Sequence, residues 1–251
     1  MSLTDRLKRS STTKSDAHSM TLVEHLTEMR VRIFVMVIAI AIGAVVAFFG
    51  YSHILNFLRQ PYCRANNGHC ALYVTSPLDG LSLRLKISLF GGLVLASPVV
   101  LFEIWRFITP GLKKNEKRYA IPFVIASVVL FLLGMALAYF TFEHALVFLS
   151  KIGGNELQQI YNPNQYLSLI VLMMFLFGAT FEFPVILVAL QLAHVITPKQ
   201  LLSWWRWAVI GITLAAALFT PSGDPLSMIA LAIPLSLFYF LAILIGKLAR
   251  R

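Results

Sequence analysis

The chain has 251 residues, of which 58% are hydrophobic and only 13% charged, and its mean hydropathy is +0.78. A soluble domain carries about twice this share of charged residues, so the composition excludes an ordinary soluble protein and indicates a polytopic α-helical membrane protein. The formal net charge of +10 does not indicate nucleic-acid binding, because the basic residues lie in the segments between apolar runs and are not clustered on one soluble module.

Six apolar runs predict six transmembrane helices. Their expected bounds are residues 33–51, 81–107, 119–142, 166–193, 207–220 and 226–245. The fifth run has 14 residues, about 21 Å of helix, which is short for a hydrocarbon core about 30 Å thick. Prolines inside the second, fourth and sixth runs predict bends. We therefore expect a bent bundle with a concave face, in which the fifth and sixth helices are short.

The membrane domain is expected over residues 21–246, between a flexible basic tail at 1–20 and a short basic tail at 247–251. An even number of spans puts both termini on the same side. Lysine and arginine concentrate on that side, in segments 6–32, 106–118, 199–206 and 247–251, whereas the opposite loops hold few of them. The positive-inside rule therefore predicts that both termini are cytoplasmic.

Cys63 and Cys70 both lie in the first external loop, residues 52–80. Two neighbouring cysteines in an oxidising compartment favour a disulfide that closes a small loop. The alternatives are two unpaired thiols, or a metal site in which His53 and His69 would be the additional ligands.

The segment before the first span is typical of an amphipathic helix at the cytoplasmic interface. Its apolar residues recur at helical spacing, and Glu24 and Glu28 share one face. From spacing alone, these acids either pair with Arg30 and Arg32 in an ordinary interfacial helix or are available to a ligand.

The first cytoplasmic loop, residues 107–118, contains a Pro110-Gly111 turn and one acid, Glu116, among basic neighbours. The loop taken alone is explained by a solvated, topology-setting role. Glu103, near the cytoplasmic end of the second span, is explained by its position near the interface.

Glu182 is a lone carboxylate in the fourth apolar run, two residues before Pro184. An ionised carboxylate in hydrocarbon is disfavoured by several kcal/mol, so a chain that keeps one there needs a partner or a use for it. One alternative that follows is a proton- or cation-coupled secondary transporter with Glu182 as its ion site.

Four motifs together identify a family. They are HLTEMRVR at 25–32, SPVVLFEIWRFITPGL at 97–112, FGATFEFPV at 177–185 and FTPSGDPLSM at 219–228. In this order, over about residues 20–245, the chain resembles the TatC family, the large membrane subunit of the twin-arginine (Sec-independent) protein translocase. The paired external cysteines resemble its actinobacterial branch.

The resemblance implies a receptor for the twin-arginine signal peptides of folded cargo proteins, which in this family bind to cytoplasmic acids. The positions implied here are Glu28, Arg30, Phe107, Pro110, Leu112, Lys114 and Glu116. The chemistry fits, because a carboxylate pairs with a guanidinium in a planar, bidentate geometry that an ammonium does not reproduce.

The resemblance also implies contacts with single-span TatA/TatB-type subunits through Glu182, Thr220 and Met228, and a functional role for Pro61 and Asp224 in the external loops. At Met228 and at Phe240 the chain departs from the polar residues common in the family.

The implied protein acts in the plasma membrane, in contact with lipid, as a homo-oligomer within a complex driven by the proton-motive force. No cofactor, metal or nucleic acid is expected, and the chain contains no GxxxxGK[ST] nucleotide motif. An intramembrane protease is disfavoured, since GxSG, HExxH and an aspartate pair within the spans are absent. We therefore expect a transport component without enzymatic activity.

Overall fold

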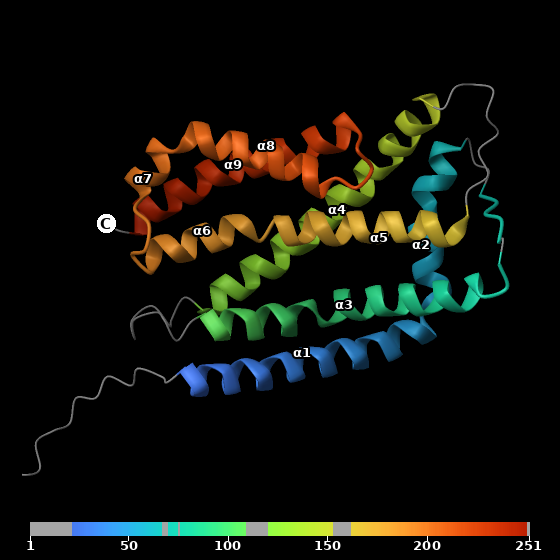
Figure 1. Ribbon diagram of the computed structural model, residues 1–251, viewed down its shortest axis with the longest axis horizontal. Coiled ribbons are helices and arrows are strands. Elements are labelled where there is room, and N and C mark those ends of the chain that lie inside the picture. The colour runs from blue at the N-terminus through green and yellow to red at the C-terminus, as the bar shows by residue number, and fades with distance from the viewer. Residues whose placement is uncertain (1–21, 67–69, 75, 109–119, 153–161, 250–251) are drawn as a thin grey trace, which may run out of the picture.

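The structure is a computed structural model, and it describes residues 22–66, 70–74, 76–108, 120–152 and 162–249 (Figure 1). All the regular structure in these ranges is helical. The helices are α1 (Leu22–Phe49), α2 (Tyr51–Ala65), α3 (Asp79–Ile108), α4 (Ala120–Ile152), α5 (Pro163–Thr180), α6 (Phe183–Leu192), α7 (Pro198–Ser203), α8 (Trp205–Phe219) and α9 (Pro225–Ala249).

The predicted polytopic helical architecture is confirmed. Five stretches are long and apolar enough to cross a membrane, in α1, α3, α4, the α5–α6 pair and α9, and α8 is a shorter apolar helix. The chain runs back and forth through these six elements, so that the start of α1 and the end of α9 lie at the same end of the bundle (Figure 1). We call this the terminal end. The α2 helix and the turn between α8 and α9 lie at the other end (Figure 1).

The segment before the first span is helical, as predicted, and is continuous with the span, because α1 runs from Leu22 to Phe49 without a break. Residues adjoining the first apolar run extend the helix here, since adding a residue to an existing helix is much easier than starting a new one. One expectation about helix length is wrong. The sixth span is not short, because α9 has 25 residues and runs through Pro234 to Ala249. The fifth span is short as predicted, with 15 residues in α8.

The α2 helix was not predicted from the sequence. It follows α1 directly after Gly50 and mixes polar with apolar residues, but it buries Leu58, Pro61 and Tyr62 against the bundle. Its axis crosses the neighbouring helices at a steep angle (Figure 1). The first half of the segment predicted to be the first external loop is therefore a helix packed on the protein.

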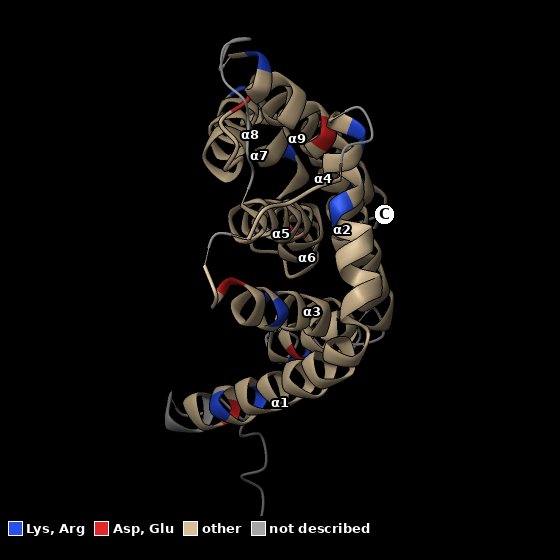
Figure 2. Ribbon diagram, turned by 90° about the vertical axis from the view of Figure 1, so that its right-hand side faces the viewer, with Lys and Arg blue, Asp and Glu red and all other residues tan. Residues whose placement is uncertain are grey.

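The helices follow a curved path, which confirms the bent, concave arrangement (Figure 2). Seen along the bundle, α1 lies at one end of the curve and α8 at the other, while α5 and α6 lie between them. In agreement with this order, α1 packs on α3 and α8 packs on α9. The most deeply buried side chains include Ile170, Met173 and Phe177 of α5, so the core lies around this central helix.

The register of α1 on α3 is set by two glycines in contact. A Cβ atom added to Gly43 would lie 2.7 Å from the Gly92 carbonyl oxygen, and one added to Gly92 would lie 2.4 Å from the Ala44 nitrogen. Only residues without a side chain allow this approach of the two backbones. Because the helices are antiparallel, residues equally far from this contact, such as Arg32 and Glu103, face one another.

Candidate functional site

A cluster of charged side chains joins α1 to α3 at the terminal end. The Arg32 guanidinium donates from Nη1 to Oε2 of Glu103 at 3.2 Å and from Nη2 to Oε1 of Glu28. Arg32 and Glu103 are buried, with 9% and 8% of their surface exposed, whereas 26% of the Glu28 side chain is exposed. We call these three residues the terminal charge cluster. Glu28 is its most accessible member.

Of the neighbouring arginines, Arg106 is the one that approaches this cluster. Arg106 approaches Glu103 to 3.9 Å from one helical turn away, but 62% of its side chain is exposed, so solvent screens this ion pair. Arg30 is exposed on α1. Of the two pairings considered for Glu28 from its spacing, the one with Arg32 is present. Glu103, explained above by an interfacial position, is instead a buried ion-pair partner.

The other residues predicted to bind a signal peptide are only partly described. Phe107 is half-buried in the last turn of α3, and the register of α1 on α3 places it level with Glu28. Pro110, Leu112, Lys114 and Glu116 lie outside the described residues. The structure thus brings Glu28 to the end of α3, the helix from which the loop carrying Glu116 continues.

Glu182 lies at a break between α5 and α6. The α-helix ends at Thr180 and restarts at Phe183, and the Glu182 carbonyl accepts the first bond of α6 from the Ile186 amide at 3.1 Å. Pro184 lacks an amide hydrogen and cannot bond to the carbonyl four residues earlier, which explains why a single helix does not continue through this point. The predicted bend in the fourth span is therefore present.

The Glu182 side chain faces α4, where the Ser127 hydroxyl lies close enough to interact with its carboxylate. Ser127 is fully buried and accepts a 2.6 Å hydrogen bond from Nε1 of Trp105 in α3. The Glu182 Oε1 atom is also buried and accepts no hydrogen bond from any described residue. This buried oxygen therefore retains the capacity to accept a hydrogen bond.

An apolar groove begins beside this break, between α4, α6 and α9. It has a volume of about 500 Å³, and Ala126, Pro184 and Phe238 are among its lining residues. Deeper between α6 and α9, Gln191 is fully buried and donates to the Ala242 carbonyl at 3.0 Å. This hydrogen bond ties the two helices together near the terminal end.

Thr220 and Met228, predicted to share a partner contact with Glu182, are not adjacent to it. Both lie at the α8–α9 turn, at the end of the bundle opposite the termini (Figure 1). Thr220 is buried and its hydroxyl donates to the Ala216 carbonyl at 2.7 Å, while Met228 packs against the core. The structure therefore separates these two positions from Glu182 along the bundle.

Asp224 caps the start of α9. Its Oδ1 atom accepts the Ser227 amide at 2.7 Å, and Oδ2 accepts the Ser222 hydroxyl at 2.5 Å. Between these serines, Gly223 has a φ of +63°, a conformation that glycine adopts without strain. With 1% of its surface exposed, Asp224 stabilises the turn and the first residues of α9.

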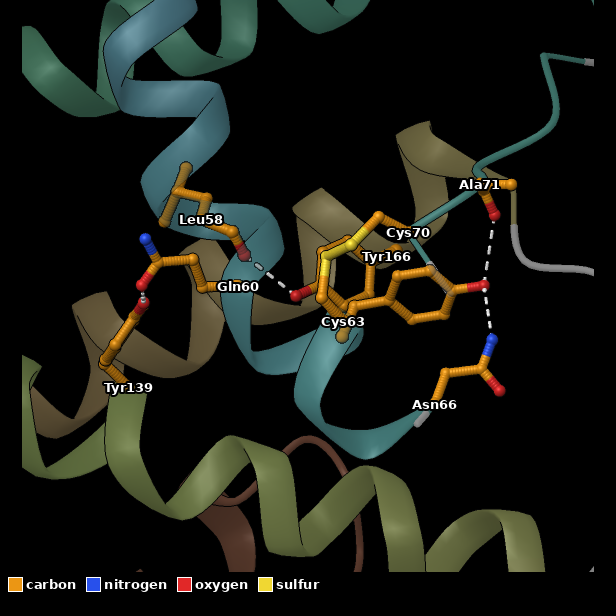
Figure 3. Close-up of a disulfide and its surroundings, with 9 residues drawn as sticks. Leu58, Gln60, Cys63, Asn66, Cys70, Ala71, Tyr139 and Tyr166 are labelled. Carbon is orange, nitrogen blue, oxygen red and sulfur yellow. Dashed lines mark hydrogen bonds between the residues drawn. A yellow bond between two sulfur atoms is a disulfide. The ribbon is translucent and has the colours of Figure 1, made fainter. Parts of the chain in front are cut away.

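Pro61 lies within α2 and affects how that helix is anchored. It cannot donate to the carbonyl of Phe57, four residues earlier, and that carbonyl accepts the Tyr139 hydroxyl of α4 at 2.9 Å instead. One residue further on, the Leu58 carbonyl accepts the Tyr166 hydroxyl of α5 at 2.8 Å (Figure 3). Two tyrosines thus fasten α2 to the bundle through backbone oxygens.

Cys63 and Cys70 form a disulfide at the end of α2 (Figure 3). The bond closes a short loop, and the Tyr62 hydroxyl donates to the Ala71 carbonyl beside it at 3.1 Å. Among the described residues, no group of three or more His, Cys, Asp or Glu side chains is placed to hold a metal ion.

Sequence reasoning missed the buried partners at both sites. Glu103 pairs with Arg32 across 71 positions. Ser127 of α4 interacts with Glu182 and itself accepts a hydrogen bond from Trp105 of α3. A polar residue inside an apolar run is a usable signal for Glu103 and Ser127, but it does not name the partner.

Comparison with known proteins identifies the chain. The family model described as "Sec-independent protein translocase protein (TatC)" matches residues 24–234. The TatC protein of Frankia casuarinae is 39% identical over 92% of this chain and 67% of its own length, and that of Aquifex aeolicus is 37% identical over 92% and 97%. A solved structure, "Crystal Structure of Twin Arginine Translocase Receptor- TatC", matches with a TM-score of 0.74 and 37% identity, covering 91% of this chain and all of that one.

The fold and the two polar sites define a polytopic helical membrane protein with a charge cluster at one end and an acid at a helix break. The relatives that share this fold are named as protein translocase components, which favours a transport component over an enzyme and over a small-solute transporter. The chain belongs to the TatC family.

Proposed function

We propose that this chain is the receptor and core subunit of a twin-arginine protein translocase. It binds the signal peptide of a folded cargo protein at the cytoplasmic face of the plasma membrane. It then assembles with single-span TatA/TatB-type subunits and with further copies of itself, and export is driven by the proton-motive force. Membership of the TatC family and the likeness to a structure described as a twin-arginine translocase receptor support this proposal.

The observation that carries the proposal is the pairing of Glu28 with a guanidinium. Glu28 accepts from Arg32 while about a quarter of its side chain remains exposed, at the end of α1 and level with the end of α3. A carboxylate in this position already accepts a charge-assisted hydrogen bond from a guanidinium. An incoming cargo arginine is the same chemical group and approaches from the exposed side. The second cargo arginine pairs with Glu116 of the adjoining loop.

The distribution of charge and of cysteine supports cytoplasmic termini. Basic residues are concentrated at the terminal end, as the positive-inside rule requires of a cytoplasmic surface. The Cys63–Cys70 disulfide joins the end of α2 to the segment that follows it, at the opposite end of the bundle, and disulfides persist on the oxidising side of the membrane.

Signal-peptide binding by Glu28→Gln tests the proposal. We would measure the affinity of the purified protein, in detergent, for a labelled synthetic peptide with two adjacent arginines before an apolar stretch. The same peptide with two lysines is the reference. Glu28→Gln is expected to weaken binding of the arginine peptide roughly tenfold to hundredfold, because a hydrogen bond to a charged partner contributes about 1.5–3 kcal/mol. Arg32 keeps Glu103 as a partner, so the variant should remain folded.

Glu143→Gln is the matched control for this experiment. Glu143 lies near the opposite end of α4 and forms a half-exposed ion pair of 3.8 Å with Arg64, so its loss should leave peptide affinity unchanged. Equal affinities of wild type and Glu28→Gln for the arginine peptide would overturn the receptor assignment.

Glu182 is proposed to contact a polar side chain in the transmembrane helix of a partner subunit. One of its oxygens accepts no hydrogen bond from any described residue, and the apolar groove between α4, α6 and α9 begins beside it. Glu182→Ala is expected to keep signal-peptide affinity but to reduce co-purification with the single-span subunit. Loss of peptide binding with normal co-purification would reject this role.

A further inference from the structure

Arg32 is the only buried cation of the terminal charge cluster, and it is shared between two acids. One nitrogen of its guanidinium bonds to Glu103 and another to Glu28, each through a single carboxylate oxygen. Its Nε atom is buried and donates to no described residue. Neither carboxylate therefore receives from Arg32 the bidentate pairing that an arginine side chain is able to give.

The two acids differ in how far solvent reaches them. Of the Glu103 side chain 10% is exposed, against 26% for Glu28. Glu103 lies on α3 level with Arg32, about one helical turn further from the start of α1 than Glu28. A ligand at the terminal end reaches Glu28 before it reaches Glu103, so any exchange of partners takes place at Glu28.

Two carboxylates of the cluster share one buried guanidinium. The exposed Arg106 adds little to this pairing, because its ion pair with Glu103 is long and screened by solvent. A second guanidinium entering beside Glu28 would give that acid an arginine partner other than Arg32. Arg32 could then turn both terminal nitrogens to Glu103, whereas a buried arginine with no remaining acid would be strongly destabilised.

We propose that, without cargo, Arg32 pairs with Glu28 at the position that a cargo arginine would take. When cargo binds, Arg32 leaves Glu28 and pairs with Glu103 alone. This inference rests on the proposed function and assigns two residues to it. Arg32 is an internal competitor, which an incoming cation must displace from Glu28. Glu103 is a positioning residue, which affects cargo affinity without contacting cargo.

The exchange explains a preference for arginine over lysine in physical terms. A ligand cation that displaces Arg32 must pair with the Glu28 carboxylate at least as strongly as the Arg32 guanidinium does. The ammonium of lysine is a compact point charge without the planar fork of a guanidinium. Competition by Arg32 therefore penalises lysine more than arginine.

A double-mutant cycle over Arg32 and Glu103 tests the exchange with the arginine and lysine peptides described above. Glu103→Gln leaves Arg32 dependent on Glu28 and is expected to weaken binding of the arginine peptide about tenfold, since removal of one partner of a buried ion pair is costly. In the Arg32→Gln background the same substitution is expected to have no effect. The double variant should bind the arginine peptide at least as tightly as wild type and discriminate less against the lysine peptide.

The outcomes are separable. An effect of Glu103→Gln that persists in the Arg32→Gln background would show that Glu103 acts on the peptide directly and would overturn the inference. So would an affinity unchanged by Glu103→Gln in the wild-type background. If Glu28→Gln weakens binding in either case, the proposed function stands and only the exchange is lost. If Glu28→Gln has no effect, both fall.

Folding of the variants is checked in the same samples. Thermal unfolding in detergent is recorded for each variant. The double variant removes both buried charges together, so it should be more stable than either single variant. Should Arg32→Gln alone unfold, Arg32→Lys replaces it. A lysine at this position bridges the two acids poorly and should likewise reduce the discrimination between the two peptides.

Discussion

Gly43 of α1 lies directly against Gly92 of α3, so closely that a Cβ atom on Gly43 would lie 2.7 Å from the Gly92 carbonyl oxygen. Arg32 and Glu103 each lie 11 residues from this contact, which is about three helical turns. The glycine contact therefore determines that these two charged residues meet. A packing feature in the middle of the bundle thus positions the charge cluster at its end.

Substitution of Gly92 by alanine should separate α1 from α3. A Cβ atom at this position would lie 2.4 Å from the Ala44 backbone nitrogen, so the helices must shift, at a cost of about 1–3 kcal/mol. We expect a lower midpoint of thermal unfolding and, in the same sample, weaker binding of the arginine peptide. Gly211→Ala is the control, since no atom lies within 4 Å of a Cβ atom there. Equal stability of the two variants would contradict the packing argument.

The Tyr166 hydroxyl is expected to stabilise α2 on the bundle. Tyr166→Phe leaves the buried Leu58 carbonyl without this donor and should lower the free energy of unfolding by about 1–3 kcal/mol. The measurement is thermal or denaturant unfolding in detergent. Tyr73, with 59% of its surface exposed, gives the control substitution Tyr73→Phe, which should change stability little. A Tyr166→Phe variant as stable as the control would show that water replaces the lost bond.

Reduction of the Cys63–Cys70 disulfide should loosen the end of α2 locally. A loop of this size contributes about 2.5 kcal/mol in the chain-entropy description of a cross-link. We expect faster hydrogen exchange in residues 58–74 of the Cys63→Ser/Cys70→Ser variant, with little change in α9.

The same cysteines test the topology. After reduction, a membrane-impermeant maleimide added to intact cells should label wild type if the loop is external. Labelling that requires cell lysis would reverse the proposed orientation.

Asp224 should affect stability through its capping bonds. Asp224→Ala removes the acceptor for the Ser227 amide and is expected to cost about 0.5–2 kcal/mol of stability, seen as a lower unfolding midpoint. Asp224→Asn keeps an acceptor oxygen in the same place and should retain most of the stability that Asp224→Ala loses. If export is lost in both variants while Asp224→Asn remains stable, the negative charge has a direct role in transport, as the family resemblance implies. If Asp224→Asn exports normally, the residue acts through the turn.

The sequence by itself determined the membrane architecture. In lipid, backbone groups must be bonded within the segment, so an apolar run of sufficient length becomes a helix whatever surrounds it. The five long apolar helices and the shorter α8 follow from this local rule, and the bend before Pro184 follows from the missing amide hydrogen of proline. The motifs around Glu28, Glu182 and Asp224 also placed the chain in its family before any contact was known.

Only the tertiary structure decided which polar groups meet. Nothing local to Arg32 indicates Glu103, which lies 71 positions away, and nothing local to Glu182 indicates Ser127. The α2 helix was missed because its stability comes from burial of Leu58, Pro61 and Tyr62 against other helices and not from an apolar run of its own. Spacing along one helix depends on a fixed period, whereas the partner across an interface depends on the register between two helices. In this protein that register is set by the contact between Gly43 and Gly92.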